Sequence, residues 1–71
     1  MAKNKKFLDL LKEKELKPQR LADKLNVSVR SVEHWINGRN RPSILYVIAM
    51  AKIFNMSVDS VYKIFKEGGK E

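Results

Sequence analysis

The side chains best suited to directional hydrogen bonding gather in the middle of this 71-residue chain. Arg30, Glu33 and His34 lie within five positions of one another, and Arg39 and Arg41 follow shortly after them. A guanidinium presents a planar fork of N–H donors that matches a pair of acceptors or an anionic oxygen. These residue types therefore indicate recognition of a polar, negatively charged partner.

The composition argues against catalysis and metal binding. The chain has one histidine and no cysteine, so a disulfide and a thiolate metal site are both excluded. It also lacks a glycine-rich phosphate loop, and a bundle this small offers no pocket for a catalytic carboxylate pair. We expect no enzyme activity, no metal, no cofactor and no small-molecule ligand.

The net charge favours a polyanionic partner. Fifteen lysine and arginine residues against eight aspartate and glutamate residues give +7. Such a surface favours nucleic acid first, and an acidic membrane or an acidic protein after it. Residues 18–42 hold five basic and two acidic residues, which makes them the predicted binding face. The lysines near the N-terminus are more simply interpreted as a solvated helix face.

Length and hydropathy limit the organisation of the chain. We predict a single domain over residues 1–66 and a flexible C-terminal tail over residues 67–71. No apolar run approaches the roughly 18 residues that a membrane span needs. The N-terminus also lacks the cleavage pattern of a secretory signal. The predicted location is the cytoplasm, without a membrane partner.

The segment VSVRSVEHWING, residues 27–38, has two interpretations. Its valines and its final Asn-Gly are typical of a strand that enters a hairpin. As a strand, however, one face would mix charge with apolar bulk. As a helix, it has a serine N-cap and a clean apolar face made of Val32, Trp35 and Ile36. We therefore predict a helix over residues 29–36 that stops at Asn-Gly.

The rest of the chain also favours helices. Pro18 suits a first helical position, Asn26 and Asn55 suit helix ends, and Ser43 and Ser57 suit N-caps. The prediction is an all-α fold of five short helices, at about residues 4–15, 18–25, 29–36 and 44–54 and from residue 58 onward. For the fourth helix two apolar faces fit the period: Leu45, Ile48, Ala51 and Lys52, or Ile48, Ala51 and Phe54.

Several positions together carry a family resemblance. They are Leu21-Ala22, Leu25 to Ser28, Val32, Trp35, Asn37-Gly38, Arg41 to Ser43, Ile48, Ala51, Phe54 and Met56 to Val58. With these residues the chain resembles the lambda-repressor-like (Cro/C1-type, XRE) helix-turn-helix family over residues 8–62. The resemblance implies a compact five-helix domain that binds double-stranded DNA in transcriptional regulators. Residues 18–25 and 29–36 would form the motif, and the second of these helices would enter the major groove.

The recognition helix is expected to read bases with the side chains that do not face the core. Arg30 is the first candidate, because its fork matches guanine O6 and N7. Val29 would pack on a thymine methyl, Glu33 would accept from cytosine N4, and His34 would donate to a base or a phosphate. Simpler alternatives stay open: Arg30 and Glu33 as a surface ion pair, Val29 as a helix start, and His34 as a solvated residue.

Phosphate contacts are expected on both sides of this helix. The candidates are Lys17, Gln19, Arg20, Ser28, Ser31, Asn37, Arg39, Asn40 and Arg41. The alternative is that the basic residues are merely solvated. The family often has glutamine where Pro18 stands, serine or threonine where Lys17 stands, and glutamate where Ile36 stands. Gln19 is therefore the candidate substitute for a missing phosphate contact, and the loop from Arg39 to Arg41 is expected to be more mobile.

Small size and the symmetry of DNA sites favour a homodimer. Two copies would place recognition helices about 34 Å apart on a palindrome. The predicted interface is the fifth helix, through Val58, Val61, Tyr62, Ile64 and Phe65; the alternative is that these residues complete a small core. The chain would then act as a repressor that occupies an operator. The alternative function is an antitoxin or another protein-interaction module on the same fold.

Overall fold

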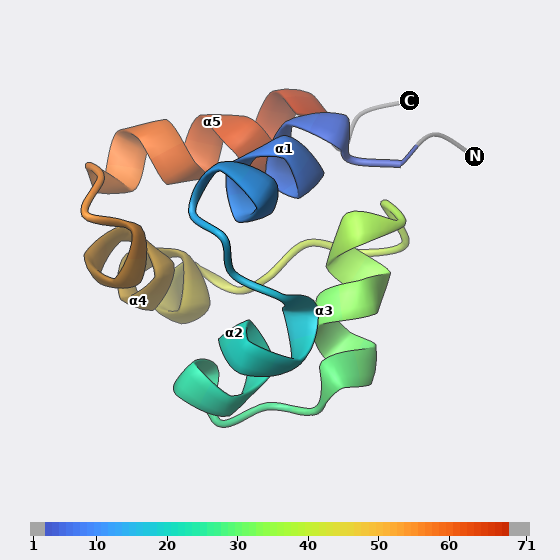
Figure 1. The fold of residues 1–71 in the computed structure, drawn as a ribbon. Coiled ribbons are helices and arrows are strands. Elements are labelled where there is room, and N and C mark those ends of the chain that lie inside the picture. Colours follow the sequence, from blue (N-terminus) through green and yellow to red (C-terminus); the bar gives the residue numbers. More distant parts are fainter. Residues whose placement is uncertain (1–2, 69–71) are drawn as a thin grey trace.

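The computed structural model describes residues 3–68 and forms five helices in this range (Figure 1). They are α1 (Lys5–Glu13), α2 (Pro18–Leu25), α3 (Val29–Ile36), α4 (Ile44–Phe54) and α5 (Val58–Gly68). The described part of the chain contains no strand, so the predicted all-α, five-helix fold is confirmed. The predicted bounds of α2, α3 and α4 are also confirmed, while α1 ends two residues earlier than expected.

The helices fall into two groups. Figure 1 shows α2 and α3 together at one end of the molecule and α1 beside α5 at the other. The helix α4 packs mainly on α5 and also touches α2. The pair α2 and α3 therefore packs against the other three helices, α3 through α1 and α2 through α4.

A single core joins these helices. The predicted core face of α3 is confirmed, because Val32, Trp35 and Ile36 are buried. Leu21, Ala22 and Leu25 of α2 are buried as well. Between α1 and α5 the rings of Phe7 and Phe65 lie 4.8 Å apart, centroid to centroid. Val27, in the turn between α2 and α3, packs against the same core. The turn is thus anchored to the core.

The prediction for α4 needs a correction. Its buried residues are Val47, Met50, Ala51 and Phe54. Leu45 and Ile48, both placed on the expected apolar face, are exposed. The helix is apolar on nearly every side, with Lys52 as its one charged residue. Periodicity therefore could not identify the inward face.

The predicted interface on α5 needs a correction too. Val61 and Phe65 are buried in the core of the chain itself, so they offer no surface to a partner. Val58 and Tyr62 are exposed and Ile64 is half-buried. For Val61 and Phe65 the alternative interpretation, completion of the core, is the one that the packing supports. The helix continues to Gly68, so it overlaps residues 67 and 68 of the predicted tail, and residues 69–71 lie outside the described residues.

The helices α2 and α4 both end at an asparagine, as predicted. Asn26 and Asn55 adopt left-handed backbone conformations, with φ of 60° and 59°. In each case the next residue donates its N–H back into the helix, from Val27 to the Ala22 carbonyl at 3.0 Å and from Met56 to the Ala51 carbonyl at 2.9 Å. This is the Schellman arrangement, which satisfies carbonyls at a helix end.

The segment after α1 also contains a residue in the left-handed conformation, but this residue is a glutamate, for which the conformation is unfavourable. Glu15 has φ of 54°, and Leu16 donates its N–H to the Leu11 carbonyl at 2.9 Å. A left-handed conformation costs a residue with a Cβ about 1–2 kcal/mol. Glycine avoids this cost, but it loses more conformational entropy on folding, which offsets part of the gain.

We expect Glu15→Gly to raise the free energy of unfolding by about 0.5–1 kcal/mol, because it relieves this strain. For a domain of this size that corresponds to a rise of about 2–8 °C in Tm, measurable by calorimetry. Lys14→Gly is the matched control: Lys14 has φ of −87° and should gain nothing. An unchanged or lower Tm for Glu15→Gly would contradict the explanation.

Candidate nucleic-acid interface

Both ends of α3 are fixed by local hydrogen bonds. At its start the Ser28 hydroxyl oxygen accepts from the Ser31 N–H at 3.3 Å, which confirms the predicted cap. At its end Gly38 has φ of 75°, and Arg39 donates its N–H to the His34 carbonyl at 2.9 Å. Glycine tolerates this conformation without a penalty. The chain therefore leaves α3 sharply, as the Asn-Gly pair predicted.

The inner side of α3 is held by three parts of the molecule. The helix α2 packs closely against α3, and its small residue Ala22 is fully buried. The Trp35 ring lies 5.7 Å from the Tyr46 ring of α4, with 43° between the ring planes. The N–H of Asn4 donates to the Ile36 carbonyl at 2.7 Å. The helix thus has a defined orientation relative to the rest of the chain.

The outer side of α3 carries the predicted base-reading residues. Arg30 and Glu33 are exposed, while Val29 and His34 are half-buried. Within residues 3–68 no ion pair joins Arg30 to Glu33, so both side chains are available to a ligand. Val29 packs partly against the core, which limits the area that it offers to a base and favours its role as a helix start.

Two of the five helices begin without a side-chain cap. Asn4, Ser28 and Ser57 cap α1, α3 and α5 with their side chains, whereas no side chain caps α2 or α4. Ser43 has the backbone conformation of an N-cap, but its hydroxyl makes no capping bond, so its predicted role is wrong. Uncapped helix N-termini present N–H groups and a partial positive charge to anions.

Each uncapped end has basic residues beside it. Lys17 and Arg20 flank the start of α2, and Arg39 and Arg41 precede α4; all four are exposed. Other candidates are partly engaged within the chain. The Gln19 amide donates to Asp23 Oδ1 at 3.1 Å, and the hydroxyls of Ser28 and Ser31 lie 3.3 Å apart. The arginines and Lys17 are therefore the stronger phosphate-binding candidates.

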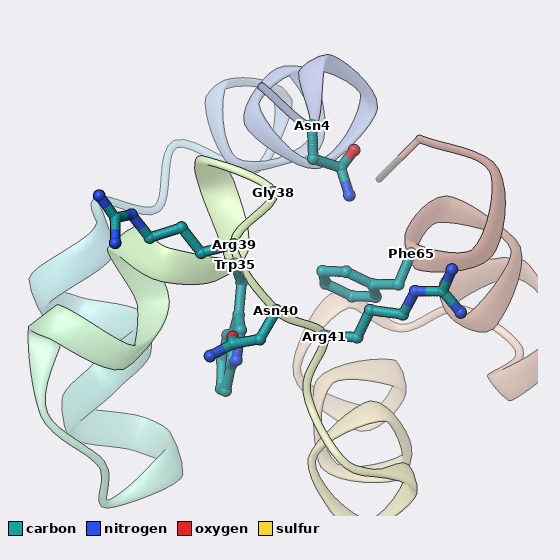
Figure 2. A pocket seen from close by; sticks show the side chains of 7 residues that line it. All are labelled: Asn4, Trp35, Gly38, Arg39, Asn40, Arg41 and Phe65. Carbon is teal, nitrogen blue, oxygen red and sulfur yellow. The ribbon is translucent and has the colours of Figure 1, made fainter. Parts of the chain in front are cut away.

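The loop after α3 covers a cavity of about 240 Å³. Residues 38–41 form one wall, and Asn4, Trp35 and Phe65 form the others. Figure 2 shows Arg39 and Arg41 extending away from each other on the two sides of this loop. Arg39, Asn40 and, at the end of α3, Asn37 are all exposed. The two arginines do not converge on a common point, so they suit two separate anionic groups.

Asn4 makes structural contacts that the sequence interpretation missed. It is 1% exposed; its Oδ1 accepts from the Phe7 N–H at 3.1 Å and its Nδ2 donates to the Ile64 carbonyl at 3.3 Å. With its backbone bond to Ile36 it joins α1, α3 and α5. The preference of asparagine for N-caps is the signal that would have found part of this role.

Comparison with known families identifies the arrangement. A Cro/C1-type helix-turn-helix family model matches residues 8–61, which is 54 of the 71 residues. The chain belongs to the Cro/C1-type helix-turn-helix family. In this Cro/C1-type domain α2 and α3 are the two helices of the motif, and the family is a DNA-binding, non-enzymatic domain type. Comparisons with curated proteins and with solved structures gave no match.

Residues 3–68 of the Cro/C1-type domain offer no candidate for two other kinds of site. Across residues 3–68 no group of three or more histidine, cysteine, aspartate or glutamate side chains is placed to hold a metal ion. None of the helices in the described range is both long and apolar enough to cross a membrane. The exposed face of α3, with the two uncapped helix ends, remains the candidate binding site.

Proposed function

We propose that this chain is a sequence-specific transcriptional regulator that inserts α3 into the major groove of double-stranded DNA. The observation that carries the proposal is the division of α3 into two faces. Val32, Trp35 and Ile36 are buried, while Arg30 and Glu33 are exposed without an ion pair between them. In helix-turn-helix proteins the N-terminal part of this helix contacts base edges, and Arg30 belongs to that part.

The proposed division of labour follows from the chemistry of each group. Arg30 reads guanine, and Glu33 accepts from cytosine N4. His34 and Val29 have a smaller part, because both are half-buried. Phosphates bind at the uncapped ends of α2 and α4, helped by Lys17, Arg20, Arg39 and Arg41. Gln19, Ser28, Ser31, Asn37 and Asn40 add polar donors around these positions.

We further propose that the chain acts as a repressor: two copies occupy a palindromic operator and exclude the polymerase. Support comes from size, since one short helix reads few base pairs and a second copy one helical turn away adds the same number. A regulator that binds operator DNA must be in the same compartment as that DNA, and we therefore keep the cytoplasm as the proposed location.

Selection of bound fragments from a random DNA pool tests this function. We expect wild type at physiological salt to enrich a motif with two inverted half-sites. Arg30→Ala should lose the preference for one base pair in each half-site, at a cost of about 1–3 kcal/mol per contact. Arg41→Ala is the control: it should weaken binding to every sequence about equally. No enriched motif for wild type would contradict specific recognition, and an unchanged motif for Arg30→Ala would contradict its role.

The exposed aliphatic side chains of α4 favour a second candidate, an antitoxin or another protein-interaction module. Salt distinguishes the two functions. Binding through several phosphate contacts weakens steeply as salt rises, by about 10³–10⁵ between 50 and 200 mM for six to ten contacts. Binding of a protein through an apolar face should change little over the same range.

A further inference from the structure

A cavity of about 340 Å³ lies between the end of α1 and the start of α2. It is larger than the cavity of about 240 Å³ beneath the loop after α3. Sites for small molecules usually have volumes of about 300–1,000 Å³ and a mostly apolar lining with a few polar groups. The residues that line this cavity lie between Leu8 and Pro18, and we call it the α1–α2 groove.

The groove is open because its two helices pack on other parts of the molecule. The helix α1 packs mainly on α5 and α3, and α2 packs mainly on α3 and α4. Residues 14–17 connect α1 to α2, and Figure 1 shows this segment running from one end of the molecule to the other. The space beside the connection is therefore not filled by an extensive contact between α1 and α2.

The greater part of the groove lining is apolar. Leu11 is buried, and Leu8, Leu16 and Pro18 are half-buried. The apolar surface is thus recessed in a hollow instead of projecting from the protein. A protein partner covers about 800 Å² on each side of a stable interface, far more than four side chains in a hollow provide. The groove therefore suits the apolar body of a small molecule better than the surface of a protein.

The charged residues of the groove favour an anion. Lys12, in the last turn of α1, and Lys17, at the start of α2, line it together with one carboxylate, that of Glu15. All three are exposed, and within residues 3–68 neither lysine forms an ion pair with Glu15. The uncapped start of α2 adds a partial positive charge, and the net charge of +7 attracts anions to the whole molecule. Apolar lining beside excess positive charge is complementary to an amphiphilic anion.

We propose that the α1–α2 groove binds a small monocarboxylate with an alkyl body, which revises the expectation that the chain takes no small-molecule ligand. The body lies on the leucines, and the carboxylate accepts hydrogen bonds from the ammonium groups of Lys12 and Lys17. Because Lys17 is also a proposed phosphate contact, the bound carboxylate lowers the affinity for DNA. This consequence rests on the DNA-binding function proposed above, and by linkage DNA lowers the affinity for the carboxylate by the same factor.

Three ligands with the same alkyl chain and different head groups test the site: octanoate, octanol and octylammonium. Each is titrated into the free protein and followed by the amide shifts of a ¹⁵N-labelled sample. We expect octanoate to bind one site with a Kd of about 0.1–1 mM, a range reasonable for so small a ligand, and to shift mainly residues 8–19. Octylammonium should bind about tenfold more weakly or not at all. Equal binding of all three ligands, or shifts spread over the whole surface, would overturn the proposal.

Variants of the lining separate the head group from the body. Lys12→Gln and Lys17→Gln should each weaken octanoate about two- to fivefold, while Glu15→Gln should strengthen it by a similar factor. None of the three should change the affinity for octanol, and Lys63→Gln on α5 is the matched control that should leave octanoate binding unchanged. Leu16→Phe fills part of the groove and should weaken octanoate and octanol alike. The proposal fails if the control weakens octanoate as much as the two groove lysines do.

The effect on DNA is measured separately, with the duplex selected above. Saturating octanoate should lower the affinity of wild type for it about fivefold or more, and acetate at the same concentration, which has no alkyl body, should not. In Lys12→Gln the same concentration of octanoate should have a smaller effect. An unchanged DNA affinity with octanoate bound would overturn the regulatory consequence. A wild type that binds no DNA would overturn the proposed function, whereas the titrations of free protein would still decide the site.

Discussion

Trp35→Ala is expected to lower the free energy of unfolding by about 3–5 kcal/mol. Trp35 is 5% exposed and is the side chain through which α3 contacts Tyr46 of α4, so its loss leaves a large cavity where the recognition helix is anchored. The total stability of a 71-residue domain is only about 4–11 kcal/mol. A large part of this stability would be lost, and the affinity for DNA would fall with the folded fraction. Urea denaturation followed by far-UV circular dichroism measures the change.

The conservative variant separates packing from base stacking. Trp35→Phe keeps an aromatic ring against Tyr46, so it should be folded and should retain most of the DNA affinity. If Trp35 stacked on bases, alanine and phenylalanine variants would both fold normally and would differ only in affinity. A Trp35→Ala protein with wild-type stability would therefore contradict the core role.

The second large effect is expected at Asn4, whose side chain joins α1 to α5. Asn4→Ala removes both the helix cap and the donor to the Ile64 carbonyl. A lost cap costs about 0.5–2 kcal/mol, and a lost hydrogen bond about 0.5–1.5 kcal/mol more. We expect a total loss of about 1–3.5 kcal/mol in the free energy of unfolding, measured by chemical denaturation.

Asn4→Ser resolves the two contributions, because serine is also a good N-cap but has no amide donor for Ile64. It should recover roughly half of the loss. The backbone bond from residue 4 to Ile36 survives in both variants, so the orientation of α3 should be preserved in whatever fraction is folded. Equal stabilities for the serine and alanine variants would show that the cap contributes nothing.

Local sequence was sufficient to predict most of the binding motif. Pro18, Asn26 and Ser28 mark the boundaries of α2 and α3, and the short apolar period of each helix identifies its buried face. These features depend on interactions within a few residues: a cap, a left-handed turn, a run of side chains on one face. Such interactions are the same in any tertiary context that buries the helix.

Two features depended on contacts with other parts of the chain. The inward face of α4 is set by its packing on α5, because a helix that is apolar on nearly every side has no pattern to mark it. Asn4 links α1 to α3 and α5 only because the carbonyls of Ile36 and Ile64, far away in sequence, lie within hydrogen-bonding distance of it. In both cases the deciding contact is made with another helix, which no window of neighbouring residues contains.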